Sequence, residues 1–149
     1  MRFAEINQER GRYKELLLLG DEDWKMVKRY LDQGRMLVGF RQGKPVGLVL
    51  AVEIKPQTWE LKNIAVLPHF QHQGCGTALL KELEKSLKND CSWLLVGTGD
   101  ADTDNIHFYL KNDFRMQAIR KHFFDQYDHP IISHGIRLQD MVVLAKKLK

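Results

Sequence analysis

The chain has 149 residues, of which 44% are hydrophobic and 28% are charged, and this composition excludes collagen-like, low-complexity and disordered proteins. Lysine and arginine outnumber aspartate and glutamate by 23 to 19, and without a clustered basic stripe this small excess argues against a nucleic-acid partner. No uncharged apolar run reaches the roughly 18 residues of a membrane span, and the N-terminus lacks the order of a secretory signal, so we expect a cytoplasmic chain with no membrane partner.

Two helices are predicted at the start of the chain. The first covers about residues 8–19, where apolar side chains recur on one side. The second is expected to begin with Asp21 as its N-cap, because a short polar side chain accepts hydrogen bonds from the first free N–H groups of a helix. Gly34 is expected to end this second helix.

The sequence then takes on the character of strands. Residues 36–40 and 46–53 favour β-structure and are joined by a turn through Gly43, which predicts a hairpin. Residues 59–66 are mostly apolar, which predicts a third strand that is buried on both faces and ends before Pro68.

An amphipathic helix is predicted over residues 76–89, with its leucines on one face and its charges largely opposite. Downstream we predict a strand at 93–96, a polar loop at 97–104, a short helix at 105–112 and final strands at 114–124 and 141–144. No repeat or linker divides the chain, so residues 1–149 are expected to form a single α+β domain.

The most informative segment is the connection from the strand 59–66 to the helix 76–89, which contains Gln71, Gly74 and Gly76. The first turn of a helix has N–H groups without intrahelical partners and a partial positive charge, so it can bind phosphate. Glycines there let the backbone approach an anion closely. The segment 71–77 therefore predicts a main-chain cradle for a pyrophosphate, although an isolated Gly-x-Gly more often only permits a turn.

The pattern Val-x-Pro-x-x-Gln-x-x-Gly-x-Gly, from Val66 to Gly76, resembles the acetyl-coenzyme A signature of the GCN5-related N-acetyltransferase (GNAT) superfamily. A dinucleotide-binding G-x-G-x-x-G would need a third glycine at Leu79, and the P-loop pattern is absent. The resemblance implies a GNAT-like mixed, mostly antiparallel sheet of about six to seven strands with helices on both faces. It also implies that the fourth and fifth strands of this sheet splay apart.

The resemblance further implies which residues contact acetyl-coenzyme A, the expected co-substrate. Main-chain groups of Ile64, Ala65 and Val66 would face the pantetheine arm, and Asn105 would lie beside the same arm. The expected cradle residues are Gln71, His72, Gln73, Gly74, Cys75, Gly76 and Thr77. A covalent acyl-enzyme on Cys75 is not expected, since this residue lies at the phosphate turn, away from the thioester.

The segment from Phe108 to Phe114 is similar to the Phe-Tyr-x-x-x-Gly-Phe stretch of the same family. This similarity implies that Tyr109 is the general acid that protonates the departing thiolate, and simple aromatic packing in the core is the alternative. Asp113 replaces the glycine of the family pattern at a position that is often left-handed, a conformation that aspartate tolerates better than most residues. Asp102 stands where the family often has asparagine.

The acceptor amine must lose a proton, and Glu60 is the first candidate for the base because several relatives carry glutamate there. Asp100, Asp102 and Asp104 in the acidic loop are alternatives, and a merely solvent-facing Glu60 stays open. Regular alternation along the strand would put Asn63 on the face opposite Glu60, unless a bulge changes the facing.

No metal is expected, because His69 and His72 lie in a predicted loop and Cys75 and Cys91 form no C-x-x-C pair. The aromatic and histidine-rich residues 121–134 suit the wall of a site for a cationic amine, and they equally suit a capped edge of the core or a dimer surface.

We therefore expect an N-acetyltransferase that transfers acetyl directly in a ternary complex to an amine of a small molecule or a protein. A non-catalytic coenzyme A-binding or regulatory module is the alternative, and a nucleic-acid-binding protein is a third interpretation that rests only on charge. The residues do not identify the amine. A homodimer is expected only because the resemblance to the family implies one.

Overall fold

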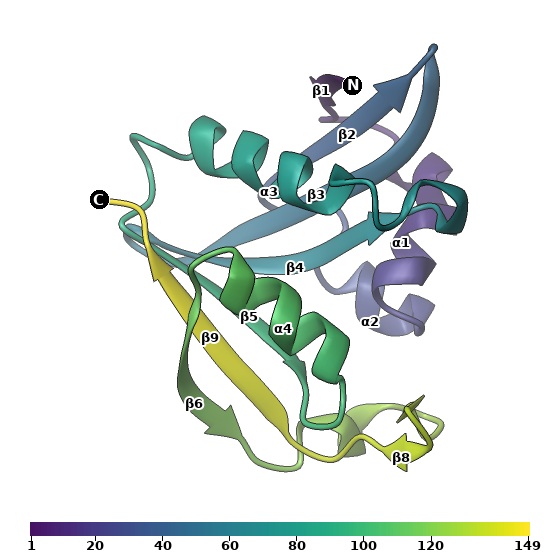
Figure 1. The fold of residues 1–149 in the computed structure, drawn as a ribbon, viewed down its shortest axis with the longest axis vertical. Helices are drawn as coiled ribbons and strands as arrows, with labels where there is room; N and C mark the ends of the chain where they lie inside the picture. The colour runs from purple at the N-terminus through teal and green to yellow at the C-terminus, as the bar shows by residue number, and fades with distance from the viewer.

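The computed structural model describes residues 1–149, and its main sheet has seven strands in the order β1-β2-β3-β4-β5-β9-β6 (Figure 1). The strands are β1 (Arg2–Glu5), β2 (Arg35–Arg41), β3 (Lys44–Lys55), β4 (Thr58–Val66), β5 (Trp93–Gly99), β6 (Arg115–Arg120) and β9 (Met141–Lys147). All neighbouring strands are antiparallel except β4 and β5, which are parallel. The expected α+β fold with a mixed, mostly antiparallel sheet is confirmed.

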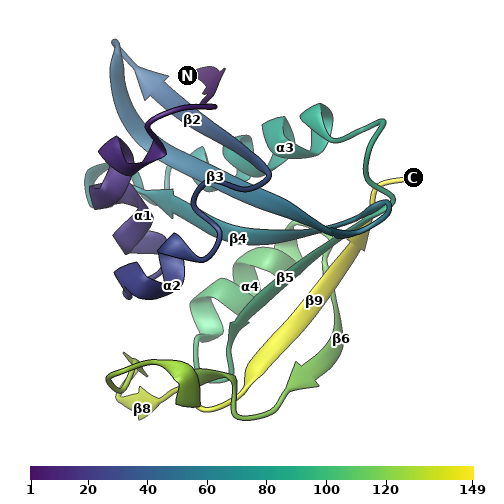
Figure 2. The same cartoon turned by 180° about the vertical axis from the view of Figure 1, so that it is seen from behind.

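Helices cover both faces of the sheet. On one face lie α3 (Cys75–Ser86) and α4 (Thr103–Lys111), and on the other lie α1 (Lys14–Gly20) and α2 (Trp24–Lys28), as Figures 1 and 2 show from opposite sides. Leu79, Leu80 and Leu83 of α3 and the C-cap residue Leu87 form one buried stripe, so the amphipathic pattern of the sequence marks the face that packs on the sheet.

The fourth and fifth strands splay apart, as expected. β4 and β5 pair only over Thr58–Leu61 and Trp93–Val96. Beyond these residues β4 continues beside β3 alone and β5 beside β9 alone, so the two strands diverge into a V (Figure 2).

A bulge in β4 changes which side chains face which layer. The register between β3 and β4 shifts so that Lys62 has no partner residue. Leu61 packs in the core with α3, whereas the Asn63 amide donates to a main-chain carbonyl of α1 at 2.9 Å. Glu60 faces away from Leu61 by alternation, so the bulge places Asn63 on the same face as Glu60.

The second helix is capped by a different residue from the one expected. Asp23 is the N-cap of α2, and its Oδ1 accepts the main-chain N–H of Lys25 at 2.8 Å and that of Met26 at 3.4 Å. The expectation for Asp21 was wrong because its carboxylate accepts tyrosine hydroxyls instead.

Both N-terminal helices are shorter than expected. A 3₁₀ turn (Arg10–Tyr13) precedes α1, and α2 ends at Lys28 rather than at Gly34. The buried guanidinium of Arg10 donates to the main-chain carbonyls of Leu31, Gln33 and Gly34, which satisfies these groups without a helix.

The C-terminal half also departs from the expected boundaries. β5 continues through residues 97–99, which were expected to be a loop, because they pair with Met141 to Val143 of β9. β6 ends at Arg120 rather than near residue 124, since His122 is left-handed and a 3₁₀ turn (Phe123–Gln126) follows. A small hairpin of β7 (Ile132–Ser133) and β8 (Ile136–Arg137) completes the connection to β9.

None of the helices combines the length and the apolar character needed to span a bilayer.

Candidate active site

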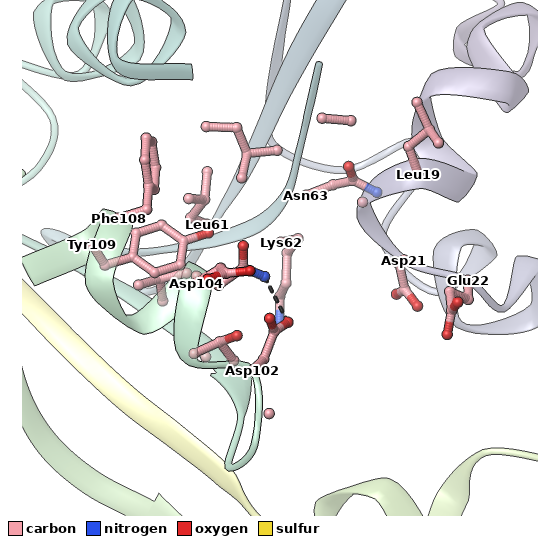
Figure 3. Close-up of a pocket in the computed structure, with 18 of the residues that line it drawn as sticks. Leu19, Asp21, Glu22, Leu61, Lys62, Asn63, Asp102, Asp104, Phe108 and Tyr109 are labelled. Carbon is pink, nitrogen blue, oxygen red and sulfur yellow. Dashed lines mark hydrogen bonds between the residues drawn. The ribbon is translucent and has the colours of Figure 1, made fainter. Parts of the chain in front are cut away.

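A cleft of about 1240 Å³ lies where β4 and β5 diverge. Both strands, the start of α3, the length of α4, the turn between α1 and α2, and the connection from β6 to β9 contribute to its wall. Figure 3 shows Asp21 and Glu22 on the α1 side of this cleft and Asp102 and Tyr109 on the α4 side. Residues that are far apart in the sequence therefore share one site.

The N-terminus of α3 opens onto the cleft with free main-chain donors. Gly74 is the N-cap with a left-handed φ of 83°, and no side chain caps the helix. The hydrogen bond from Ala78 N–H to the Gly74 carbonyl at 3.0 Å closes the first helical turn, so the preceding N–H groups lack intrahelical acceptors. A Cβ on Gly76 would lie 3.2 Å from the Phe108 ring, and glycine therefore also allows α3 and α4 to approach. This geometry suits a phosphate group.

The loop before α3 is held by its glutamines. The Gln71 amide donates to the Val66 carbonyl at 2.9 Å, and the Gln73 amide donates to the His69 carbonyl at 3.0 Å. Gln71 and His72 line the cleft, whereas Gln73 does not and instead accepts a bond from Arg41 at 3.3 Å. The predicted cradle thus shares the wall of one cleft, except for Gln73.

The open edge of β4 also faces the cleft. Leu67 N–H donates to the Val46 carbonyl of β3 at 2.9 Å, so alternation turns the main-chain groups of Val66 and Ile64 toward the side of β5. β5 has already diverged there and supplies no partners. An extended ligand with amide groups would pair with this edge as a strand does.

Tyr109 is positioned by the way α4 ends. Phe114 N–H donates to the Tyr109 carbonyl and Asp113 N–H to the Leu110 carbonyl, at 3.0 and 3.2 Å, and Asp113 is left-handed with φ of 74°. These are the bonds of a Schellman motif, which is commonly accompanied by an apolar contact across the turn. That contact is the one between the Tyr109 and Phe114 rings, whose centroids are 5.5 Å apart. The Phe-Tyr-x-x-x-Asp-Phe pattern therefore encodes the placement of the tyrosine.

The hydroxyl of Tyr109 lines the cleft and makes no hydrogen bond with another protein group. Burial raises the pKa of Tyr109, and the nearby Asp102 charge raises it further. The phenol therefore keeps its proton at neutral pH and can donate it.

Glu60 lies in the same cleft as a buried carboxylate between two cations. Lys62 Nζ is 2.7 Å from one oxygen and Arg120 Nη2 is 2.8 Å from the other. Burial by itself would raise the pKa of Glu60, but the hydrogen bonds from Arg120 and Lys62 outweigh it, so the pKa is lowered. Glu60 is thus ionised at neutral pH.

The acidic loop divides into two parts. Asp102 and Asp104 line the cleft, whereas the Asp100 carboxylate accepts the main-chain N–H groups of Gln139 and Asp140 and ties two loops together. The Asn105 amide donates to Asp102 at 2.7 Å. Burial raises the pKa of Asp102, against the lowering effect of this hydrogen bond.

A network of polar side chains lies on the α1 side of the cleft. The hydroxyls of Tyr127 and Tyr30 donate to the two oxygens of Asp21 at 3.1 and 3.2 Å, and the Asn63 amide donates to Tyr30 at 3.1 Å. Burial raises the pKa of Asp21, while the hydrogen bond from Tyr127 lowers it.

The connection between β6 and β9 crosses the cleft as a strap (residues 121–140). Phe123, Phe124 and Tyr127 of this strap contact one another and line the cleft. These three residues of the aromatic tail are therefore part of the cleft wall.

No group of three or more potential ligands could hold a metal ion, and both cysteines are buried and free.

The polar network was missed by the sequence interpretation. Asp21 was read only as a helix cap, and Tyr127 is 106 residues away from it. The only local signal for a different role was that Asp21 stands two positions before Asp23, the residue that caps α2.

The sequence matches the pattern of the acetyltransferase (GNAT) family over residues 3–114. It is 36% identical over 132 residues, which are 87% of this chain and 85% of the relative, to the uncharacterized N-acetyltransferase YvbK of Bacillus subtilis.

Two solved structures have a fold very similar to that of this chain. A GNAT family acetyltransferase from Elizabethkingia anophelis with acetyl-CoA bound has a TM-score of 0.93 and 33% identity, covering 98% of this chain and 97% of the other. A Bacillus subtilis acetyltransferase in complex with CoA has a TM-score of 0.88 and 32% identity, over 98% and 97% of the two chains.

Proposed function

Because this chain belongs to the GNAT family and is therefore an acetyl-CoA-dependent N-acetyltransferase, we propose that its cleft transfers acetyl directly to a primary amine while both substrates are bound. The acceptor is an amine of a small molecule or of a protein. The observation that carries the proposal is one cleft that joins free helix N–H groups, an unpaired strand edge and an unbonded tyrosine hydroxyl.

The residues of the cleft fit coenzyme A. The N–H groups at the start of α3 and the glycines Gly74 and Gly76 suit its pyrophosphate. The main-chain groups of Ile64 and the N–H of Val66 suit the amides of its pantetheine arm, which would lie in the gap between β4 and β5, whereas the Val66 carbonyl already accepts from Gln71. Asn105, at the first turn of α4, lies along the same gap. Bound acetyl-coenzyme A supplies the activated acetyl thioester.

We assign the removal of the amine proton to Glu60. An ammonium ion has no lone pair for attack, so the acceptor must be deprotonated in the cleft. The ionised Glu60 carboxylate, held by Lys62 and Arg120, can orient a water that carries this proton away. Asp102 is the competing base because burial raises its pKa and so improves its ability to take up a proton.

We assign the protonation of the departing sulfur to Tyr109. Its hydroxyl has no protein partner, and its raised pKa keeps the proton in place until negative charge develops nearby. The buried Cys75 sits in the first turn of α3, so direct transfer rather than an acyl-cysteine is favoured.

The experiment mixes the protein with acetyl-coenzyme A and a panel of amines, and measures thiol release together with the mass of the product. Release that depends on the amine supports the proposal. A protein that binds coenzyme A by calorimetry but releases no thiol with any amine would instead be the alternative, a coenzyme A-binding regulatory module.

A further inference from the structure

Arg120 reaches Glu60 from a strand that is not its neighbour. β5 and β9 separate β6 from β4 in the sheet, yet the Arg120 guanidinium donates to both oxygens of Glu60, from Nη2 to Oε1 at 2.8 Å and from Nη1 to Oε2 at 3.4 Å. On the way it contacts Met141 Sδ of β9 at 3.7 Å. A Cβ on Gly97 of β5 would collide with the same sulfur, so this glycine leaves Met141 its place beside the guanidinium.

Arg120 is not part of the cleft wall. Glu60 and Lys62 line the cleft, whereas Arg120 does not. Glu60 is also the only carboxylate within salt-bridge distance of Arg120. Arg120 can therefore act on the reaction only through Glu60.

The donors around Glu60 use its two oxygens unequally. Oε2 accepts from Lys62 Nζ at 2.7 Å and from Arg120 Nη1, whereas Oε1 accepts only from Arg120 Nη2. A carboxylate has about four acceptor positions, two on each oxygen, so Oε1 keeps one. Because Glu60 lines the cleft, this position can hold the water that carries the amine proton away.

The two cations hold the carboxylate in different ways. A guanidinium is a planar fork that fixes the plane of a carboxylate, whereas an ammonium is a point charge that does not. The terminal torsion of a glutamate is broad. With Lys62 alone, the Glu60 carboxylate would be free to turn about a single bond to Nζ.

Arg120 also affects the proton affinity of Glu60. Burial raises the pKa of Glu60, and the hydrogen bond from Arg120 is the largest of the effects that lower it, followed by the one from Lys62. The residues paired with Glu60 on β3 and β5, Val52 and Leu95, carry no charge. Without Arg120, burial would be opposed by Lys62 alone, and the pKa should rise.

We propose that Arg120 is a positioning residue, which fixes the plane of the Glu60 carboxylate and keeps one acceptor position of Oε1 available to the water that takes up the amine proton. This inference rests on the proposed function, in which Glu60 removes that proton. It requires that the effect of Arg120 on the reaction disappear when Glu60 is absent.

The test separates the charge of Arg120 from its shape. Arg120→Gln removes both the charge and the fork, whereas Arg120→Lys keeps the charge and removes the fork. Arg115→Gln is the matched control, because Arg115 is an exposed arginine of the same strand without a carboxylate partner. Single-turnover rates are measured from roughly pH 4 to pH 9 with acetyl-coenzyme A and the panel amine that releases thiol fastest. The Glu60 carboxyl is titrated by NMR without coenzyme A.

Arg120→Gln should lower the maximal single-turnover rate roughly 10- to 100-fold, the cost of a misplaced catalytic group. It should also raise the pKa of Glu60 by about one to three pH units and move the acid limb of the rate profile to higher pH. Arg120→Lys should lower the maximal rate but leave this pKa within about one unit of the wild type. Arg115→Gln should match the wild type in both measurements, and coenzyme A affinity should be constant throughout.

A double-mutant cycle tests whether Arg120 acts through Glu60. In a Glu60→Gln background, adding Arg120→Gln should change the single-turnover rate by less than about twofold. A further loss as large as in the wild-type background would overturn the inference, because Arg120 would then act independently of Glu60.

The remaining outcomes distinguish this inference from the proposed function. Wild-type rates or an unmoved Glu60 titration in Arg120→Gln overturn the inference and leave acetyl transfer standing. A Glu60→Gln protein with wild-type rates overturns the base and its positioning residue together, although amine-dependent thiol release still supports acetyl transfer. A wild-type protein that releases no thiol with any amine overturns the proposed function, and the Glu60 titration then still decides whether Arg120 holds the carboxylate.

Discussion

Replacing Tyr109 by phenylalanine removes one hydroxyl and leaves the ring. The ring packs edge-on against Phe108 and Phe114, with centroid distances of 5.2 and 5.5 Å, and phenylalanine keeps both contacts. The hydroxyl has no protein partner, so no hydrogen bond is lost. The free energy of unfolding should therefore change by less than about 0.5 kcal/mol, against about 1 kcal/mol for a bonded tyrosine. For a domain of this size the melting temperature should shift by less than roughly 2 °C.

Catalysis should respond much more strongly. A general acid contributes about 10²-fold or more, which corresponds to roughly 2.7 kcal/mol of transition-state stabilisation. Because this interaction forms only as charge develops on sulfur, kcat and kcat/KM should fall together while the affinity for coenzyme A stays constant. Burial raises the pKa of Tyr109, so the wild-type rate should not decline through loss of this proton until the pH exceeds the ordinary tyrosine value of about 10.

Single-turnover rates are the appropriate measurement, because product release can mask the chemical step. They should be compared with coenzyme A binding by calorimetry and with thermal unfolding of the same variant. A Tyr109→Phe protein with wild-type single-turnover rates would refute the assignment and leave the proton to water. A variant that lost stability or coenzyme A affinity in proportion to its activity would show that the tyrosine acts by packing.

Four further results are expected. Glu60→Gln should lower the unfolding free energy at pH 7 by about 1–3 kcal/mol, since it removes the negative charge that binds both Arg120 and Lys62. The lowered pKa of Glu60 means that its stabilisation is present at neutral pH and is lost as the pH falls through that pKa, so denaturant curves of variant and wild type should converge in acid. Gly74→Val should weaken coenzyme A binding at least tenfold by calorimetry, because a branched residue at φ of 83° distorts the cradle; unchanged affinity in a folded variant would contradict this. Asp113→Gly should raise the free energy of unfolding by up to about 1 kcal/mol, since glycine adopts φ of 74° without strain. A slightly higher melting temperature would show this gain. Hydrogen exchange by NMR should show the Val66 amide becoming protected when coenzyme A binds, and an unaltered exchange rate would place the pantetheine arm elsewhere.

The parts of the site that could be predicted depend on local signals. The cradle follows from glycines that open a helix, and the structure starts α3 at Cys75, one residue before the predicted start. Tyr109 follows from a helix-ending pattern whose hydrogen bonds span only five residues. Such features depend on residues within about one helical turn of each other, so the local sequence is enough to predict them.

The end of β5 could not be predicted in the same way. Gly97 and Gly99 suggested a loop, but they are strand residues paired with β9. Their lack of side chains serves packing, since a Cβ on Gly97 would lie 2.1 Å from Met141 Sδ and one on Gly99 2.4 Å from Leu138. The glycines make room for a segment some 40 residues downstream, which no local pattern reveals.

The facing of Glu60 and Asn63 depends on tertiary structure for a similar reason. Alternation predicts opposite faces, and only the bulge at Lys62 brings both to one side. The network from Asn63 through Tyr30 to Asp21 then joins three separate elements. Its members have no common spacing in the sequence.

The short pairing of β4 with β5 has a mechanical consequence. In the strand ladder only four residue pairs, Thr58–Leu61 against Trp93–Val96, join two leaves of the sheet, one formed by β1 to β4 and the other by β5, β6 and β9. A ligand bonded to both edges of the gap would act as a splint across the leaves. Coenzyme A bound as proposed would be a temporary member of the sheet as well as a reactant, and hydrogen exchange along β4 and β5 should then be slowest in the complex.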